Sequence, residues 1–554
     1  MIGLRSSVAS VLLATAALFL LPASSRAQDH HDWTYNLSIY EVNVRQYTEA
    51  GTFAAFASHL DRLQNMGVGI LWFMPVHPIG QENRLGTLGS YYSVRDYLDV
   101  NPEFGTLNDF KALVQAIHDR GMHVIMDWVA NHTAWDNNLT TEHPEWYVTD
   151  SQGNFIPPPG TNWSDVIELD YTEQGLRDYM IDAMKFWIEE VGVDGFRCDA
   201  VSFVPLDFWQ EAIAELKATK PDVFMLAEGD GRQWHDAGFD MTFGWGLYGF
   251  ERGVLKRIAD GVDTAADLYN YAANEKAIYP EEAYRMYFTA NHDENSWHGT
   301  TAELFGGAAE VFAVLTATFN GMPLIYSGQE AGLDKRLAFF DKDRIIWRDD
   351  ENADLYKTLL HLKKENRALW NGVSGGPLQR VATTNDTDVF AFVREMDDDR
   401  VLVAMNLSDQ EQTVTLTGDS FTGTYEDAFS GETAVLEEEA SLTLPAWDYV
   451  IYEARTTDTG ADFETTPEGL DLGQNHPNPF SSSTTISYSL AAPSEVRLTV
   501  VDVLGREVKV LDSGRKQAGR HRIAFGATGL PSGVYAYRLR AGEKAETRRL
   551  VVLR

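Results

Sequence analysis

The sequence predicts an α/β fold whose main part is a (β/α)8 TIM barrel. Between residues 39 and 371, short runs rich in β-branched and aromatic residues alternate with amphipathic stretches, as in a parallel sheet with helical crossovers. The length of this region suits eight such units with one insertion. Acidic residues or histidines follow several of the predicted strands, and such barrels gather their active site at the carboxyl ends of the strands.

Eight elements of the barrel can be placed individually. Apolar runs predict six strands, over residues 69–74, 123–127, 195–199, 223–228, 287–289 and 323–326. Apolar positions at helical spacing predict helices over residues 110–120 and 176–191. We assign residues 28–375 to the barrel, with a short irregular domain inserted after the third strand, at about residues 131–170.

Three further segments follow the barrel. Residues 376–455 contain strand-like runs that predict an all-β domain, an antiparallel β-sandwich. Residues 456–467 are rich in threonine and lack apolar periodicity, as expected of a linker. Residues 468–554 alternate apolar and polar positions, with glycines between the runs, and predict a second β-sandwich.

The first 27 residues have the pattern of a signal peptide. Arg5 precedes an apolar run over residues 8–21, and small residues lead up to Ala27. The apolar run is too short to span a bilayer comfortably, although an uncleaved anchor is the alternative. We therefore expect an exported mature chain without a transmembrane anchor.

The charge of the chain excludes some classes of partner. The formal net charge is −37, with 44% hydrophobic and 12% aromatic residues. Such an acidic chain repels phosphate backbones, so no nucleic-acid partner is expected. Residues 468–554 hold 13 basic and 8 acidic residues, and residues 1–27 hold two arginines, which leaves −44 on residues 28–467. The single cysteine, Cys198, rules out an intramolecular disulfide.

The last segment of the chain contains a set of short motifs in a fixed order. They are residues 474–480 (QNHPNPF), 502–508 (DVLGREV), 530–535 (LPSGVY) and 548–554 (RRLVVLR). Together they resemble the C-terminal sorting domain of the type IX secretion system. The resemblance implies that the outer-membrane type IX machinery is a partner and that the protein is secreted or held at the cell surface. An ordinary accessory β-domain is the alternative.

Four predicted strands end in ionisable side chains. These are Asp127, Asp199, Glu228 and, just after the run 287–289, the pair His292 and Asp293. A single aspartate at a strand end is more often the cap of the following helix. Four strand ends with the same character predict one shared site instead.

The segments around these residues resemble the signature motifs of the α-amylase superfamily, glycoside hydrolase family thirteen. The matching pieces are residues 127–132 (DWVANH), 195–200 (GFRCDA), 226–228 (LAE) and 288–293 (FTANHD). Their order and spacing carry the resemblance, which covers roughly residues 33–455. It implies a hydrolase that cleaves α-1,4-linked glucans with retention, using Asp199 as nucleophile, Glu228 as acid and base, and Asp293 as a third catalytic carboxylate.

The residue types suit this chemistry. Retaining hydrolysis needs two nearby carboxyl groups, one ionised and one protonated. Arg197 lies two residues before Asp199, so on a strand both side chains point to the same face, where the guanidinium favours the ionised carboxylate. Glu228 follows an apolar run, and partial desolvation there favours the protonated acid. Arg197 as a simple buried ion pair is the alternative.

Further side chains are expected to contact the sugar. The resemblance implies hydrogen bonds from Asp127, His132 and His292, together with Arg197, and Tyr92 as an aromatic platform under a pyranose ring. For His132 a structural role is the alternative. Cys198 should point away from the site by strand alternation and fill the core.

A calcium ion is the only cofactor that the resemblance suggests. Many relatives hold Ca²⁺ at the base of the inserted domain, and Asn131 and Glu168 stand where ligands would be expected. Oxygen ligands suit this ion. Just after the nucleophile, α-amylases often have Lys-His, whereas this chain has Ser202-Phe203. The missing lysine puts strict α-amylase specificity in question.

Two other functions stay open at this point. One is a maltogenic, cyclodextrin-cleaving or glucan-transferring enzyme, because water and an acceptor sugar compete for the same intermediate. The other, from a different class, is a surface glycan-binding protein without turnover. The presence of all three carboxylates argues against the second.

Overall fold

The computed structural model describes residues 30–249, 253–348, 350–454, 470–472, 483–490, 493–502, 506–516, 519–526, 530–542 and 544–552. The chain divides into two compact units at residues 455 and 456, and each unit is described by itself. The predicted signal peptide, the predicted linker and residues 474–480 of the tail lie outside the described residues.

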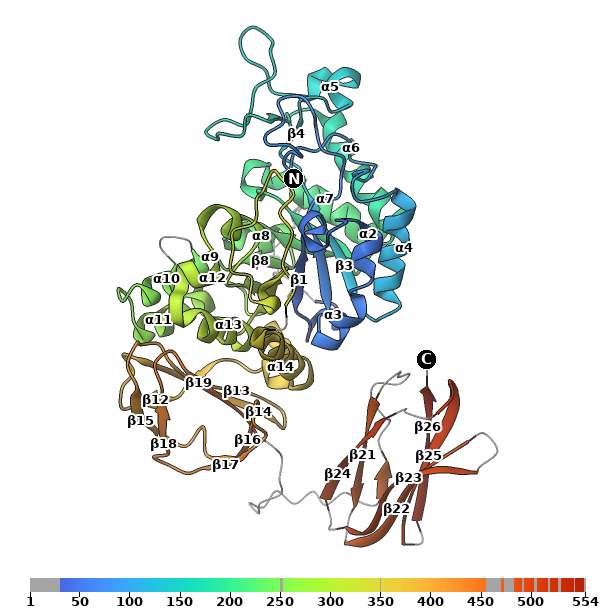
Figure 1. Ribbon diagram of the computed structural model, residues 1–554, viewed down its shortest axis with the longest axis vertical. Helices are drawn as coiled ribbons and strands as arrows, with labels where there is room; N and C mark the ends of the chain where they lie inside the picture. The colour runs from blue at the N-terminus through green and yellow to red at the C-terminus, as the bar shows by residue number, and fades with distance from the viewer. Residues whose placement is uncertain are drawn as a thin grey trace, which may run out of the picture. The chain divides into compact units, whose positions relative to one another are not determined.

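Parallel strands of the first unit close into a barrel in the order β1-β10-β9-β8-β7-β6-β3-β2 (Figure 1). They are β1 (Ile39–Val42), β2 (Ile70–Phe73), β3 (His123–Trp128), β6 (Gly195–Cys198), β7 (Phe224–Ala227), β8 (Met241–Phe243), β9 (Tyr284–Tyr287) and β10 (Met322–Tyr326). The barrel confirms the predicted (β/α)8 fold. The predicted run 287–289 begins where β9 ends, and no individual prediction was made for β1 or β8.

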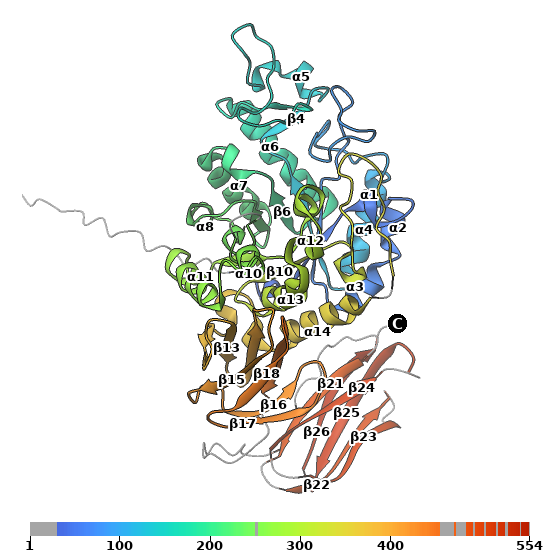
Figure 2. The same ribbon diagram turned by 60° about the vertical axis from the view of Figure 1, so that its left-hand side comes forward.

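Helices surround the barrel in both views (Figures 1 and 2). They are η1 (Asp32–Thr34), α1 (Val44–Tyr47), α2 (Phe53–Ala57), α3 (Leu60–Met66), α4 (Leu107–His118), α6 (Gln174–Phe186), η3 (Trp187–Val191), η4 (Val201–Phe203), α7 (Leu206–Thr219), α8 (Arg232–Ala237), α9 (Trp245–Tyr248), α10 (Val254–Ala259), α11 (Ala265–Ile278), η5 (Glu294–His298), α12 (Thr301–Phe305), η6 (Gly306–Ala308), α13 (Ala309–Thr318), η7 (Gln329–Ala331), α14 (Glu351–Glu365), η8 (Arg367–Leu369) and η9 (Gly372–Ser374). Turns η3 and η5 are π-helical.

Helix α4 illustrates why these segments fold as they do. Thr106 and Asp109 form a capping box that satisfies backbone donors at its first turn. Phe110, Leu113 and Ile117 follow at helical spacing, and all three are buried against the barrel. The predicted helix over residues 110–120 corresponds to α4.

One glycine is needed for the strand that carries the predicted nucleophile. A Cβ at Gly195, the first residue of β6, would lie 1.9 Å from the backbone oxygen of Phe224 on β7. No side chain fits there without moving the backbone of β6 or β7. Gly195 therefore allows β6 and β7 to pack closely, and Asp199 and Glu228 directly follow these two strands.

The predicted inserted domain leaves the barrel after β3. It contains β4 (His132–Ala134), α5 (Leu139–Glu142), η2 (Pro144–Trp146) and β5 (Val166–Glu168), and β4 pairs antiparallel with β5. Both ribbon views show the domain projecting from the barrel on the side away from β13–β19 (Figures 1 and 2).

Antiparallel sheets follow the barrel within the same unit. One has the order β11-β13-β14-β19-β16-β17 and the other β12-β15-β18. Their strands are β11 (Gln379–Arg380), β12 (Ala382–Thr383), β13 (Val389–Met396), β14 (Asp399–Asn406), β15 (Gln412–Thr417), β16 (Gly423–Asp427), β17 (Thr433–Leu436), β18 (Ser441–Leu444) and β19 (Tyr449–Ala454). Arg394 of β13 ties them to the barrel, because its buried guanidinium donates to the backbone oxygens of Thr318 and Phe319 at 3.1 and 2.9 Å.

The second unit has a hydrophobic core of its own. Its two sheets have the orders β20-β21-β24 and β23-β22-β25-β26. The strands are β20 (Leu470–Leu472), β21 (Ser483–Leu490), β22 (Ser494–Val501), β23 (Glu507–Lys516), β24 (Gly519–Gly526), β25 (Gly533–Ala541) and β26 (Lys544–Val552). Across both units, every helix among the described residues is too short or too polar to cross a bilayer.

Candidate active site

A cavity of about 900 Å³ opens at the carboxyl ends of the barrel strands. Five of the residues predicted from the sequence line it, namely Tyr92, His132, Asp199, Glu228 and Asp293. Asp127, Arg197 and His292 lie behind this lining and are at most 2% exposed. The structure thus gathers all eight residues that were predicted to act on substrate around one cavity.

Arg197 is the centre of the charged cluster. Its Nη1 lies 2.8 Å from both Asp127 Oδ1 and Asp199 Oδ1, and its Nη2 lies 2.8 Å from Glu228 Oε1. In the parallel register of the strands, Arg197 on β6 pairs with Asp127 on β3 and with Leu226 on β7. Glu228 follows Leu226 by two residues, so both carboxyl groups lie within reach of the guanidinium. Three carboxyl groups hold the pKa of the buried guanidinium well above its usual range, so it stays charged.

Glu228 has the environment of a carboxylic acid. Burial raises its pKa to about 8, the charges of Asp199 and Asp293 add to the rise, and Arg197 opposes it. The backbone N–H of Ala200 donates to Glu228 Oε2 at 2.7 Å. This environment favours the protonated form of Glu228, the state from which it can donate a proton.

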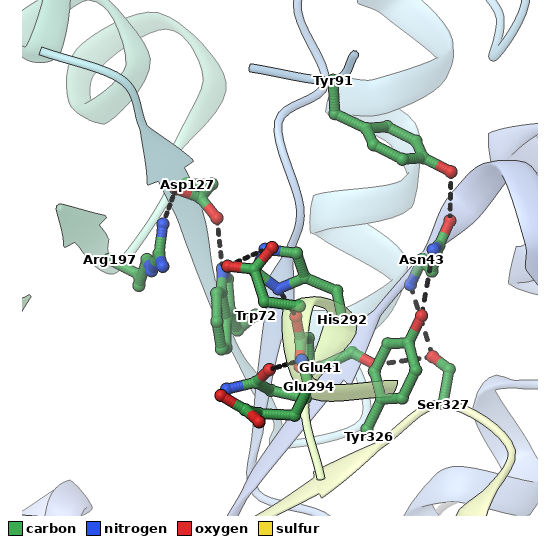
Figure 3. Close-up of polar contacts among 12 residues, drawn as sticks. Glu41, Asn43, Trp72, Tyr91, Asp127, Arg197, His292, Glu294, Tyr326 and Ser327 are labelled. Atoms are coloured by element: carbon green, nitrogen blue, oxygen red, sulfur yellow. Dashed lines mark hydrogen bonds and ion pairs between the residues drawn. The ribbon is translucent and has the colours of Figure 1, made fainter. Parts of the chain in front are cut away.

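Asp127 is fully buried behind the cavity. Besides Arg197, its carboxylate accepts a hydrogen bond from Trp72 Nε1 at 3.2 Å (Figure 3). It also accepts one from the Tyr92 hydroxyl at 2.9 Å. Burial raises the pKa of Asp127 to about 7, although Arg197 opposes the rise. Asp127 thus holds Arg197 and Tyr92 in place, and a direct contact with sugar stays a prediction.

Sequence reasoning missed Glu41 on β1. His292 Nδ1 lies 2.5 Å from Glu41 Oε1 (Figure 3). On the other side of the ring, His292 Nε2 lies 2.7 Å from the Tyr92 hydroxyl. Burial lowers the pKa of His292, but the charges of Asp293 and Glu41 outweigh it and raise the pKa to about 9. Glu41 is completely buried. The available signal was a lone glutamate in the apolar run of residues 39–42.

Tyr92 has little free surface for the predicted stacking on sugar. Its side chain is only 9% exposed, and its ring stacks with His292 at 5.3 Å and with Phe339 at 6.2 Å between centroids. The hydroxyl links His292 to Asp127. A role in holding the network is visible, and contact with a pyranose face stays a prediction.

Two aromatic walls of the cavity were not predicted. Trp163 and Phe203 form one, with ring centroids 5.6 Å apart. Trp297 lies 5.1 Å from Phe339 and 5.7 Å from Phe340 in the other. These residues come from the inserted domain and from segments after β6, β9 and β10, so no local motif marks them.

The two expected calcium ligands lie close together at the base of the inserted domain. The backbone oxygen of Asn131 accepts a hydrogen bond from Leu169 N at 3.1 Å, next to Glu168 at the end of β5. Burial raises the pKa of Glu168, and the charge of Asp170 adds to the rise. Backbone and carboxylate oxygens suit Ca²⁺. Within the described residues, no three His, Cys, Asp or Glu side chains cluster as metal ligands, and calcium stays a prediction.

Comparison with known families agrees with this geometry. The α-amylase catalytic domain matches residues 19–167 and 160–412, and the C-terminal domain of maltogenic amylase matches residues 379–451. Residues 475–553 match the secretion system C-terminal sorting domain, which confirms the resemblance of the tail.

Individual proteins show the same relationship. The chain is 25% identical to alpha-amylase 2 of Dictyoglomus thermophilum, covering 71% of this chain and 69% of that protein. It is 24% identical to the maltogenic alpha-amylase of Bacillus acidopullulyticus, covering 73% and 70%.

Among solved structures, a noncanonic maltogenic alpha-amylase, AmyB from Thermotoga neapolitana, is 30% identical with a TM-score of 0.68, covering 76% of this chain and 98% of that one. An alpha-amylase from Lactobacillus plantarum is 32% identical with a TM-score of 0.67, covering 76% and 99%. The chain belongs to the α-amylase family of glycoside hydrolases and carries a C-terminal type IX sorting domain.

Proposed function

We propose that this glycoside hydrolase cleaves α-1,4-glucosidic bonds of starch-like glucans and maltooligosaccharides with retention. One observation carries the proposal. A single buried guanidinium, Arg197, contacts Asp199 through Nη1 and Glu228 through Nη2, each at 2.8 Å. Retention requires two carboxyl groups about 5–5.5 Å apart, and contact with one guanidinium keeps these two close.

The first step forms a covalent glycosyl-enzyme. Asp199, whose negative charge is balanced by Arg197, attacks the anomeric carbon and forms a new C–O bond. The glycosidic C–O bond breaks as Glu228 gives its proton to the leaving oxygen. The raised pKa of Glu228, about 8, favours the protonated acid that this step needs.

The second step reverses the roles. Glu228, now a carboxylate, takes a proton from water while the water oxygen attacks the anomeric carbon and Asp199 leaves. Arg197 contacts both carboxyls, so it can stabilise the negative charge on whichever of the two carries it. A sugar hydroxyl in place of water gives transfer instead of hydrolysis.

A second candidate is a maltogenic or cyclodextrin-cleaving enzyme. Residues 379–451 match the maltogenic amylase C-terminal domain, and several similar proteins are cyclomaltodextrinases. In addition, Ser202 and Phe203 replace the Lys-His pair, and Phe203 forms an aromatic wall with Trp163. These observations support short or cyclic glucans as well as starch.

The sorting domain supports export. We propose that the type IX machinery carries the enzyme to the cell surface or the medium, after the predicted signal peptide directs it across the inner membrane. A chain ending at residue 467 is then expected to accumulate inside the outer membrane, as cell fractionation can measure.

The product profile over time on maltoheptaose and on β-cyclodextrin tests the proposed function. An α-amylase is expected to degrade maltoheptaose into several products and to open the cyclic substrate slowly. Rapid cleavage of β-cyclodextrin with maltose as the main product favours the second candidate. Binding of maltoheptaose without any turnover contradicts both and supports a glycan-binding protein.

A further inference from the structure

Trp297 is an exposed aromatic residue close in sequence to a predicted catalytic carboxylate, Asp293. It lies in the π-helical turn η5, four residues after Asp293, and its Nε1–H donates to Asp293 Oδ1 at 3.1 Å. The residue is 49% exposed and lines the cavity. One edge of the indole thus contacts a predicted catalytic group while much of the ring remains free.

Hydrogen bonds of Glu294, the first residue of η5, fix the turn that carries Trp297. The backbone N–H of Glu294 donates to Asn291 Oδ1 at 2.8 Å. The buried Glu294 carboxylate accepts from the Tyr248 hydroxyl at 2.9 Å and contacts His298 Nδ1 at 2.7 Å. A π-helical turn costs stability and is common at functional sites.

The same turn is hydrogen-bonded to the loop after β10, which carries Phe339 and Phe340. Asn295 accepts from the backbone N–H of Leu337 at 2.9 Å and donates to the backbone oxygen of Lys335 at 3.2 Å. This loop continues into Phe339 and Phe340, whose rings contact Trp297. The indole is therefore held in one orientation, unlike a solitary surface tryptophan.

A large aromatic ring that is held rigidly and half exposed in a cavity is suited to stacking on an apolar face. The faces of pyranose rings present C–H groups, and an aromatic platform costs little conformational entropy to organise. The polar Nε1–H has already found its partner in Asp293. The free part of the indole is thus its apolar surface.

We propose that Trp297 positions substrate in two ways: its exposed ring stacks on the sugar adjacent to the cleaved unit, and its Nε1–H orients Asp293. Asp293 Oδ1 is then held by the indole, while Asp293 Oδ2 lies 3.4 Å from His292 Nε2. The inference rests on the proposed function, because it assigns a sugar to the cavity.

Two substitutions separate these roles. Trp297→Phe keeps an aromatic face but loses the N–H, whereas Trp297→Ala loses both. On maltoheptaose, W297F is expected to lower kcat about tenfold with KM changed by less than about threefold, because a hydrogen bond to a charged group is lost. W297A is expected to lower kcat similarly and to raise KM about tenfold, because stacking is lost too.

Trp347→Phe is the matched control. Trp347 also donates its Nε1–H, to the backbone oxygen of Tyr47 at 2.6 Å, but does not line the cavity. W347F is expected to keep the unmodified kcat and KM. Equal kinetic constants for W297A and the unmodified enzyme, or KM changes of equal size in W297F and W297A, would overturn the inference.

Calorimetric binding of maltoheptaose separates failure of this inference from failure of the proposed function. The titration is made in Asp199→Asn, with and without W297A, so that no turnover is needed. About tenfold weaker binding with W297A supports the stacking platform even where the unmodified protein shows no hydrolysis. Equal affinities overturn it even where the unmodified protein is fully active.

Discussion

At the residue scale, the site depends on buried charges that hold one another in fixed protonation states. Arg197 contacts three carboxyl groups. His292 contacts Glu41 through Nδ1 and Tyr92 through Nε2. The polar and charged groups around His292 come from several elements and include Asp293, the next residue in the chain. The others are Glu41 on β1, Tyr92 after β2, Asp127 on β3 and Arg197 on β6. A change in one charge is therefore expected to move the titration of the others.

The first prediction concerns Glu41→Gln. In the unmodified enzyme, kcat/KM is expected to fall as pH rises through about 8, where Glu228 loses its proton, because His292 with a pKa of about 9 titrates later. Removing the charge of Glu41 lowers the pKa of His292, since burial then acts with less opposition. If turnover needs protonated His292, its loss of a proton then comes before that of Glu228, and the alkaline limb of the pH profile should move to lower pH.

Glu330→Gln is the control for this variant. Glu330 is another buried glutamate, but it accepts from Tyr40 and Arg62 outside the cavity. Its substitution should leave the pH profile in place. An unchanged alkaline limb in Glu41→Gln would contradict the role given to Glu41.

At the element scale, the sequence predicted long or strongly marked elements and missed short ones. The strands before Asp127, Asp199 and Glu228 were placed because each is an apolar run that ends in a carboxylate. Strand β8 has only three residues, too few for a periodic signal, and β1, which is as short as β6 and β7, is not followed by a carboxylate that would mark its end. Glu41 was missed for that reason.

The aromatic walls could not be predicted for a different reason. Their rings come together only when the inserted domain, η4, η5 and the loop after β10 surround the same strand ends. No pairwise spacing in the sequence encodes such a contact. The positions of the carboxylates, by contrast, could be predicted, because each lies at the carboxyl end of a barrel strand and these ends converge on one site.

The second prediction tests the packing of β6 against β7. Gly195→Ala is expected to cost several kcal/mol or to prevent folding, because its Cβ would lie 1.9 Å from a backbone oxygen of Phe224. Gly192→Ala is the comparison: it has a φ of 87° but open space around the Cβ, and should cost only about 1 kcal/mol. Denaturant unfolding measures both, and equal losses would contradict the steric account.

The third prediction concerns calcium at the inserted domain. If Asn131 and Glu168 hold Ca²⁺, the ion binds only the folded chain and stabilises it, so EGTA should lower Tm by a few degrees. Glu168→Gln should remove the response to the ion. A Tm that is the same with calcium and with EGTA would contradict the predicted site.

At the scale of the whole molecule, the charge is divided between the two parts of the chain. Residues 28–467 carry −44, whereas residues 468–554, with 13 basic and 8 acidic residues, are positive. This excess is far larger than the carboxylates around the cavity account for. The enzyme part, and not the sorting domain, is the acidic part of the protein.

The fourth prediction follows from this charge. Self-repulsion of a highly charged surface is relieved when salt shortens the Debye length from about 10 Å at 0.1 M to about 3 Å at 1 M. Raising KCl to molar concentrations is therefore expected to increase Tm and to preserve activity. A steady fall of both between low and molar KCl would show that the charge is not an adaptation to salt.

The central claim is that Asp199 is the nucleophile and Glu228 the acid and base, both positioned by Arg197. Trapping tests it most directly: Glu228→Gln is incubated with α-maltosyl fluoride, whose fluoride leaves without a proton, and the protein is digested for peptide mass mapping. The account predicts that the sugar is attached to Asp199, with no label in an Asp199→Asn, Glu228→Gln double variant. A label on another residue, or a label that persists in the double variant, would contradict it.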